Sequence, residues 1–317
     1  LSTPIRSYAS RYNFRFVEGE VVGFDTDRNR VRTLSTSIPY DYCIIAAGSQ
    51  TNFYGNAQVE ANALKLDCVS DSRTLHGALS GGGYDHVVVC GGGYTGVETA
   101  TFVRRFYDAH SVSPTISIVE MLDTLVKPLP RWMKRYVAEN LDRMNITPRT
   151  DTKVESIEDR SITLSDGTRI DNALLVWTAG MKAAACTEAI DVPRGSQNRP
   201  AVDDYLRVLD NVFAAGNVAC YPADGGCAGM AAQMSLAQGA CAARNVIHSR
   251  GNLPLEPFRP VNWGFLVPMA NRQSCGQLFG INVGGKLATF FHYLINAYRS
   301  FGIVNKTAVM YRGLRGI

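Results

Sequence analysis

The sequence of 317 residues lacks several features that would define its class at once. No apolar run reaches about 18 residues, so no membrane-spanning helix is predicted. No signal peptide is visible, and no metal site is expected. The eight cysteines form no C-x-x-C pair, which argues against a zinc ribbon and against a dithiol motif. We expect buried, reduced thiols in a cytoplasmic protein, as for Cys90 in its apolar run.

Acidic residues are absent after Glu256, although the rest of the chain contains 28 of them. This last segment carries seven basic residues, Arg259, Arg272, Lys286, Arg299, Lys306, Arg312 and Arg315. The net charge of the whole chain is only +4, which does not imply nucleic acid as a partner. A basic tail on a mildly acidic body instead suggests an anionic surface as the partner.

The order of apolar segments predicts an α/β protein. Residues 14–17, 21–24 and 30–33 are rich in β-forming side chains, and residues 42–48 form an apolar run that ends in Gly48. A helix is predicted at 67–79. Next come a strand at 86–90, a helix at 97–107, a strand at 115–120 and a helix at 130–144. This β-α-β order predicts parallel strands joined by a right-handed crossover.

The second half of the chain returns to strands before its long helix. Residues 162–164 and 168–170 flank Asp166-Gly167, a strong hairpin signal. Apolar runs at 174–177 and 212–216 predict further strands, and residues 230–248 are predicted to be helical.

The turn after the strand at 86–90 carries the clearest chemical signal. Gly91, Gly93 and Gly96 fit the pattern G-x-G-x-x-G, with Gly92 and Thr95 between them. In this pattern the glycines permit a tight turn, a close approach of a pyrophosphate, and close packing of helix on strand. The phosphates then meet free N–H groups at the helix start. The alternative is a glycine-rich loop without a ligand.

Glu120 ends the next strand, where a carboxylate can accept hydrogen bonds from a ribose 2′-hydroxyl. The same charge repels a 2′-phosphate, so NADH is predicted in preference to NADPH. The alternative is a solvated glutamate at a strand end.

Three strands end in two small residues and a glycine: Ala46-Ala47-Gly48, Thr178-Ala179-Gly180 and Ala214-Ala215-Gly216. With the segments 40–48, 174–180 and 211–219, this set resembles the flavoproteins that have two dinucleotide-binding domains. The resemblance implies two Rossmann-like domains, with FAD and NADH as cofactors. The cofactor-binding residues that it implies, beyond the first turn and Glu120, are Ala47, Gly48, Ala179, Gly180, Gly216 and Asn217.

Within that superfamily the chain resembles the type II NADH:quinone oxidoreductases. Residues 93–98 are similar to the family segment GxTGvE, and residues 232–239 are similar to AQxAxQqG. The resemblance implies that Glu98, Gln233 and Gln238 are catalytic. It also implies hydride transfer from NADH to flavin, followed by transfer of two electrons to a quinone. Because no membrane-spanning helix is predicted, no proton pumping is expected. The alternatives are a carboxylate that only faces a helix dipole, and glutamines of a helix surface.

The chain departs from the family in two respects. It has one G-x-G-x-x-G segment, which matches the second of the family, so we expect a fragment that lacks part of the flavin domain. Asn217 stands where the family has an aspartate. The predicted parts are a flavin domain at 1–66 and 183–257, an NADH domain at 67–182, and a membrane-association region at 258–317.

These departures keep two other functions open. One is an NADH-binding module without flavin. The other is a different electron acceptor, as in relatives with paired active-site cysteines, for which Cys220 and Cys227 are the candidates.

Residues 286–299 have apolar side chains at the spacing of one helix face. These are Leu287, Phe290, Phe291, Leu294, Ile295 and Tyr298. The helix is too short to span a bilayer, and only basic charges lie near it, so it suits a bilayer interface. The resemblance implies the same anchoring, and we expect a peripheral protein on the cytoplasmic face of a membrane. The alternative is a helix that faces the core or a second copy of the chain in a homodimer.

Overall fold

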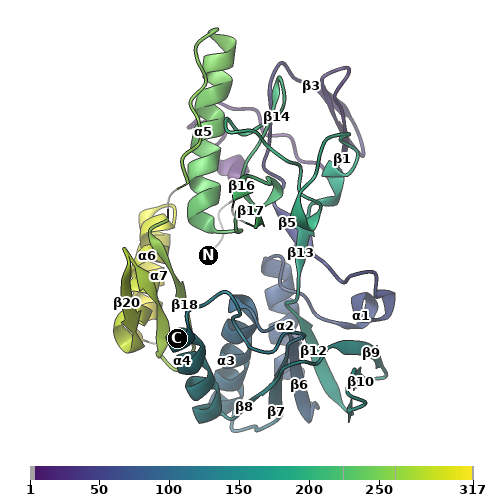
Figure 1. The fold of residues 1–317 in the computed structure, drawn as a ribbon, viewed down its shortest axis with the longest axis vertical. Helices are drawn as coiled ribbons and strands as arrows, with labels where there is room; N and C mark the ends of the chain where they lie inside the picture. The colour runs from purple at the N-terminus through teal and green to yellow at the C-terminus, as the bar shows by residue number, and fades with distance from the viewer. Residues whose placement is uncertain (1–3, 224, 261, 316–317) are drawn as a thin grey trace. The chain divides into compact units, whose positions relative to one another are not determined.

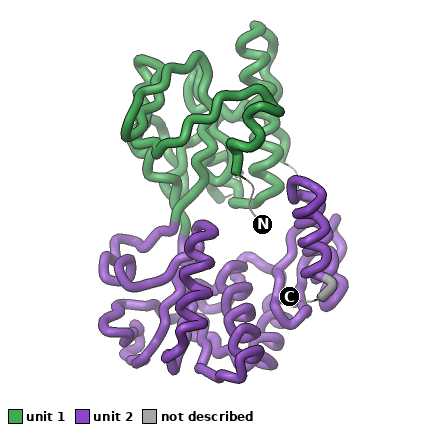
Figure 2. Tube along the Cα trace, turned by 180° about the vertical axis from the view of Figure 1, so that it is seen from behind, with its two compact units in different colours: residues 1–50, 181–262 green, residues 51–180, 263–317 purple. Residues whose placement is uncertain are grey.

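The computed structural model describes residues 4–223, 225–260 and 262–315. The chain divides into two compact units (Figure 2). Unit 1 contains residues 1–50 and 181–262, and unit 2 contains residues 51–180 and 263–317. The sequence-based boundaries at 66, 182 and 257 differ from these, and the C-terminal segment belongs to unit 2 rather than standing apart.

Unit 2 is built on a parallel sheet with the strand order β12-β6-β7-β8 (Figure 1). Its strands are β6 (His86–Cys90), β7 (Thr115–Val119), β8 (Ile146–Arg149) and β12 (Ala173–Trp177). The valines at the centre of β6 are completely buried, which explains why this segment is an uninterrupted apolar run. The predicted parallel pairing is confirmed, since His86 lies opposite Thr115 in register.

Helices and a small antiparallel sheet cover the two faces of this parallel sheet. One core cluster joins Val87 and Ile116 to side chains of α3 (Tyr94–Ala109) and α4 (Arg131–Arg143). Val88 and Leu175 point the other way, into a second cluster with the antiparallel sheet. That sheet contains β9 (Val154–Glu158), β10 (Ser161–Leu164) and β11 (Arg169–Ile170). The predicted hairpin is therefore confirmed. The short helix α1 (Ala57–Asn62) and α2 (Val69–Gly81) precede β6.

The C-terminal part of unit 2 contains an antiparallel sheet that the sequence does not predict. Its strands are β18 (Gly264–Val267), β19 (Ser274–Leu278) and β20 (Ile281–Gly284). Val267 and Cys275 pack into the same core cluster as α3 and α4, which joins this sheet to unit 2. The chain then forms α6 (Gly285–Arg299), as predicted, and α7 (Ile303–Arg315), which is not predicted.

In the part of unit 1 that the structure describes there are two three-stranded sheets, shorter two-stranded pairings and one long helix. The antiparallel strands are β1 (Val21–Asp25), β2 (Arg30–Thr33) and β3 (Ser37–Pro39). The second sheet contains β14 (Arg207–Leu209), β15 (Val212–Ala214) and β4 (Cys43–Ile45), and β4 and β15 are parallel. Helix α5 (Ala232–Arg250) packs beside β15. The short elements are β5 (Ser49–Thr51), β13 (Met181–Ala183), β16 (Pro222–Ala223) and β17 (Gly226–Cys227), with 3-10 turns η1 (Ile5–Tyr8), η2 (Ala185–Thr187), η3 (Ser196–Asn198) and η4 (Gly216–Val218).

The strand predicted at residues 14–17 is wrong. This segment has no regular structure, and Phe14, Phe16 and Val17 are exposed. A strand needs a neighbouring strand to pair with, and β propensity alone does not supply one.

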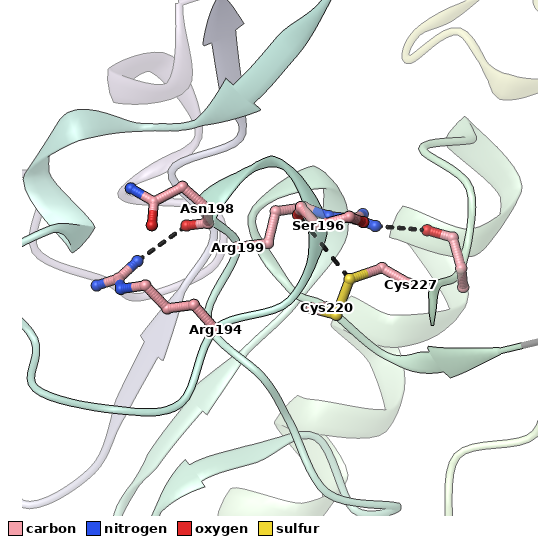
Figure 3. Close-up of a disulfide and its surroundings, with 7 residues drawn as sticks. Arg194, Ser196, Asn198, Arg199, Cys220 and Cys227 are labelled. Carbon is pink, nitrogen blue, oxygen red and sulfur yellow. Dashed lines mark hydrogen bonds between the residues drawn. A yellow bond between two sulfur atoms is a disulfide. The ribbon is translucent and has the colours of Figure 1, made fainter. Parts of the chain in front are cut away.

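The prediction that the cysteines are reduced is also wrong for one pair. Cys220 and Cys227 form a disulfide, with Cα atoms 4.9 Å apart (Figure 3). The hairpin of β16 and β17 brings the two residues together, because Pro222 pairs with Cys227. A spacing of seven residues matches no redox motif, so the pairing depends on a turn that the sequence pattern does not reveal. The six other cysteines are free.

Candidate functional site

The predicted phosphate-binding turn lies between β6 and α3. Gly91 has φ of +110°, which a side chain would disfavour. A Cβ atom on Gly96 would overlap the carbonyl oxygen of Gly91, so this glycine is needed for close packing of helix and strand. At Gly93 a Cβ atom would meet nothing within 4 Å, and this residue caps α3. The turn is therefore closed on the protein side and open on the other, as a phosphate cradle requires.

Glu120 is held directly beside this turn. Its Oε2 accepts a hydrogen bond from Gly92 N–H at 2.6 Å, and its Oε1 accepts one from Leu122 N–H at 2.9 Å. Each carboxylate oxygen has a second lone pair, so the group can still accept hydrogen bonds from the hydroxyl groups of a ligand. Glu120 is therefore oriented before any ligand arrives.

A cavity of about 760 Å³ in unit 2 contains the mouth of this turn. Its volume is in the range of small-molecule and cofactor sites. The predicted residues that line it are Gly91, Gly93, Glu120, Ala179 and Gly180. Gly92 lies behind Glu120, and Thr95 and Gly96 continue into α3 without lining the cavity. The structure thus brings together five of the predicted nucleotide-binding residues from three segments of the chain.

The end of β12 is fixed to the end of β6 at the wall of the cavity. Thr178 N–H and Thr178 Oγ1 both donate to the carbonyl oxygen of Cys90, each at 2.8 Å. A Cβ atom on Gly91 would lie 2.8 Å from Ala179 N, so the two strand ends are in close contact.

The sequence analysis does not identify the aromatic wall of the cavity. The rings of Phe53 and Trp177 lie 5.7 Å apart, and Trp177 Nε1 donates to the carbonyl oxygen of Asn52 at 3.0 Å. Tyr54 packs on the backbone of Gly180 and has a positive φ of 53°, which is unusual for a bulky residue. Phe53 and Tyr54 lie in the loop after β5, whereas Trp177 is the last residue of β12. Only folding brings these distant segments to the same cavity.

Glu98 lies on α3 and does not line the cavity. Burial raises the pKa of its carboxyl group to about 7. Its backbone carbonyl oxygen accepts a hydrogen bond from Thr101 Oγ1 at 2.8 Å, whereas its carboxyl group has no hydrogen-bond or ion-pair partner among the described residues. The pKa of Tyr293 on α6 is raised by burial, and the charges of Arg105 and Glu98 also act on it, in opposite directions. Glu98 is therefore a carboxyl group that can gain or lose a proton near neutral pH.

In unit 1 the structure brings together several of the residues predicted to hold the flavin. Gln238 is buried, and its Oε1 accepts a hydrogen bond from Gly216 N–H at 2.8 Å. Asn217 Nδ2 donates to Ser49 Oγ, beside Gly48, at 3.1 Å. Gly48 and Gly216 end the parallel strands β4 and β15 with φ of +72° and +82°.

The side of this cluster at Gly48 is open. A Cβ atom there would meet nothing within 4 Å, and neighbouring Ala47 is exposed. Nucleotides bind outside the carboxyl ends of parallel strands, so the residues present fit the phosphate or ribityl part of a dinucleotide.

Gln233 does not share the face of Gln238. The two residues are five positions apart on α5, which rotates one about 140° from the other in an α-helix. Gln233 is half-buried. The two glutamines therefore face different surroundings, although the sequence motif names them together.

In the ranges that the structure covers, no three His, Cys, Asp or Glu side chains gather in an arrangement that could hold a metal ion. No described helix is both long enough and apolar enough to cross a membrane.

These features define a class of protein: an α/β protein in which a glycine turn between a parallel strand and a helix lies beside a fixed carboxylate in one unit. Residues 5–243 match the family described as pyridine nucleotide-disulphide oxidoreductase. The chain belongs to this family, and the prediction that it is an oxidoreductase enzyme is confirmed.

Comparison with individual proteins points in the same direction. The chain is 25% identical to the type II NADH:quinone oxidoreductase of Haemophilus influenzae, over 94% of this chain and 79% of that protein. It is 30% identical to an NADH dehydrogenase-like protein of Mycobacterium tuberculosis, over 77% of this chain but only 65% of that protein.

Among solved structures, NDH2 from Plasmodium falciparum in complex with NADH is similar, with a TM-score of 0.79 at 16% identity. That match covers 93% of this chain and 83% of the other, and it confirms the mixed α/β fold. Together with the family match, these comparisons support an NADH-dependent oxidoreductase and the prediction of FAD and NADH as cofactors.

Proposed function

We propose that this protein oxidises NADH and passes the electrons, through FAD, to a quinone at a membrane surface. The observation that carries the proposal is the cavity in unit 2, where an open glycine turn and a fixed carboxylate lie together. The choice of a quinone as the electron acceptor is based on the similarity to type II NADH:quinone oxidoreductases.

In this proposal the residues of unit 2 bind and orient NADH. The pyrophosphate lies over Gly93, where the first N–H groups of α3 have no partner within the helix. The ribose hydroxyls bind Glu120, which is held in place by Gly92 and Leu122. The negative charge of Glu120 disfavours a 2′-phosphate, so NADPH is the poorer donor.

The residues of unit 1 hold the second nucleotide. When it is bound, FAD accepts a hydride from NADH and gives two electrons to the acceptor. Gly48, Gly216 and Asn217 lie at the ends of two parallel strands, and Gln238 fixes the loop at Gly216. We assign Gln238 the task of holding this loop, because its Oε1 is already used by a backbone N–H.

Glu98 is the proposed proton-carrying group. Quinone reduction consumes two protons, and a carboxyl group with a pKa of about 7 is both protonated and ionised in large fractions at neutral pH. An ordinary glutamate would be almost completely ionised there and would seldom hold a proton to donate.

The surface of α6 supports the membrane part of the proposal. Four of its large apolar side chains are exposed, at 56% for Leu287, 43% for Phe290, 40% for Leu294 and 77% for Tyr298, while Phe291 and Ile295 are half-buried. Its buried positions are instead the small residues Ala288, Thr289 and Ala297. A helix that served only the core of its own chain would have the opposite arrangement.

Exposed apolar residues continue into α7, where Ile303 and Val304 are 74% and 73% exposed. The charged residues in the sequences of the two helices are all basic: Lys286, Arg299, Lys306, Arg312 and Arg315. This combination is typical of helices that lie in the interface of anionic bilayers, and we place the protein on the cytoplasmic face.

A steady-state assay tests this function. With FAD and a water-soluble quinone, we expect NADH oxidation that depends on the quinone and that is much slower with NADPH. NADH oxidation at the same rate without quinone would contradict the acceptor. An equal rate with NADPH would contradict the role of Glu120.

A further inference from the structure

The disulfide of unit 1 lies against a buried arginine, and nothing in the proposed electron transfer uses either. Arg199 is only 2% exposed. Its Nη2 donates to the carbonyl oxygen of Ala228, the residue after Cys227, at 3.0 Å. Cys220 N–H donates to the carbonyl oxygen of Pro200, the residue after Arg199, at 2.8 Å. The arginine is therefore tied to the residue after Cys227, and its neighbour Pro200 is tied to Cys220, in the region that Figure 3 draws.

The positive charge of Arg199 is poorly compensated. No acidic side chain of the described residues pairs with it, and its buried Nε has no hydrogen-bond partner among them. A buried cation without an anion is costly, and such a site stabilises any negative charge that forms next to it. Ala228, whose carbonyl oxygen binds Arg199, adjoins Cys227, and the two cysteine sulfurs gain negative charge when the disulfide is reduced.

The residues around the disulfide leave space for both sulfur atoms and provide a hydrogen-bond acceptor for a reduced thiol. A Cβ atom on Gly195 would overlap both sulfur atoms, so the bare backbone is needed for the sulfurs to lie there. The carbonyl oxygen of Ser196 lies 3.9 Å from Cys227 Sγ, where a thiol at residue 227 would have an acceptor for its proton. Cys220 is buried and Cys227 is half-buried, so an incoming reductant reaches Cys227 first.

We propose that Cys220 and Cys227 form a redox-active pair that exchanges electrons with dithiols, and that Arg199 stabilises the thiolate of the reduced state. A thiolate of the dithiol attacks Cys227 Sγ, the Cys220–Cys227 bond breaks, and Cys220 leaves as a thiolate beside Arg199. The second thiolate of the dithiol then attacks its own mixed disulfide, and Cys227 leaves and takes a proton. Two electrons pass to the protein, and the dithiol becomes a cyclic disulfide.

The first experiment establishes the pair. The native protein is alkylated without reductant and digested, and the peptides are weighed. We expect residues 220 and 227 to be linked and unmodified, while exposed Cys68 is alkylated. Alkylation of Cys220 and Cys227 in the untreated, folded protein would overturn the proposal.

The second experiment measures exchange. The folded protein is equilibrated with mixtures of reduced and oxidised dithiothreitol, and alkylation of the 220 and 227 peptides gives the midpoint. We expect the disulfide to be reduced reversibly while the protein stays folded, and circular dichroism monitors the fold. Reduction that occurs only when the protein unfolds would overturn the proposal.

The role of Arg199 has its own matched variants. In the reduced Arg199→Met variant we expect alkylation of the pair at neutral pH to be roughly tenfold slower, because the thiolate fraction falls. Arg199→Lys keeps the charge and should keep most of the rate. Arg194→Met is the control, since the Arg194 side chain donates to backbone carbonyl oxygens, those of Thr187, Ile190 and Asn198, and not to the residues that flank the disulfide. Equal rates in the wild type and Arg199→Met would overturn the assignment.

If Arg199→Met does not fold, the wild type alone still decides. The alkylation rate of the reduced pair should follow an apparent pKa below the ordinary thiol value of about 8.5. An apparent pKa at or above that value would overturn the role of Arg199.

Discussion

Glu98 is an acidic residue whose pKa lies well above its ordinary value. Burial raises its pKa from 4.5 to about 7, so between these pH values the folded chain binds a proton that the unfolded chain releases. The contribution of Glu98 to stability therefore falls as the pH rises through this window. Glu98→Gln cannot ionise, and we expect its stability relative to the wild type to increase by about 1–2 kcal/mol from pH 5 to pH 8. Urea denaturation at both pH values measures this.

Glu139→Gln is a suitable control for that experiment, because Glu139 is an exposed residue on α4. A constant difference between Glu98→Gln and the wild type would show that Glu98 keeps an ordinary pKa.

The charge of Glu120 should control how well the protein uses NADH and how strongly it prefers NADH to NADPH. Glu120→Gln keeps the shape of the side chain but loses the charge that strengthens hydrogen bonds to ribose. We expect kcat/KM for NADH to fall by roughly 10- to 100-fold, and the preference for NADH over NADPH to shrink. Asp123→Asn, on the same loop but paired with Lys127 outside the cavity, is the control. An unchanged NADH/NADPH ratio would contradict the proposed role.

At the scale of elements, the turn between β6 and α3 offers a matched pair of glycines. Gly93→Ala places a methyl group in open space, so the free energy of unfolding should change little while NADH binds at least tenfold more weakly. Gly96→Ala forces a methyl group onto the carbonyl oxygen of Gly91, so it should destabilise the fold itself. Thermal unfolding and NADH titration separate the two effects. Normal NADH affinity in Gly93→Ala would contradict a pyrophosphate at this turn.

Helix α6 gives the prediction for the membrane. Replacing Leu287 and Leu294 by Gln removes apolar groups that are exposed already, so stability should be unchanged. Binding to anionic vesicles in a sedimentation assay should weaken at least tenfold, since about 2 kcal/mol or more of burial is lost. Lys134→Gln, on α4, is the control. Unchanged vesicle binding, together with a dimer that the double variant disrupts, would show that the face binds a second copy instead.

Local patterns explain which elements the sequence predicts well. The valine run of β6 and the apolar periodicity of α4 and α6 specify their own structure, and their predicted bounds agree with the observed ones within a few residues. The strands β18 to β20 are short, rich in glycine and paired only with each other, so they carry little periodic signal. The error at residues 14–17 has the same origin, because strand formation depends on a partner.

Some residues of the site come together only through contacts between distant segments, so the sequence alone does not reveal them. The glycine turn and Glu120 were identified because their roles follow from local spacing. The aromatic wall of Phe53, Tyr54 and Trp177, and the Cys220–Cys227 pair, arise from contacts between separate segments. Glu98 was named by resemblance, but its raised pKa depends on how deeply the folded chain buries it.

At the scale of the whole molecule, the two units have separate tasks in the proposed function. Unit 2 contains the nucleotide cavity and the exposed apolar helix, and unit 1 contains the loops at Gly48 and Gly216 that fit a second dinucleotide. The account requires that electrons enter at one nucleotide and leave through the other. A protein with only the first site would bind NADH without passing electrons on.

The most direct test is an anaerobic spectroscopic titration of the purified protein supplied with FAD. The account predicts that bound flavin loses its visible absorption band when NADH is added, and that a quinone then restores the band while oxygen is absent. Electron transfer from NADH through FAD to a quinone would be refuted if FAD did not bind, if NADH left the band unchanged, or if the band stayed bleached after the quinone was added.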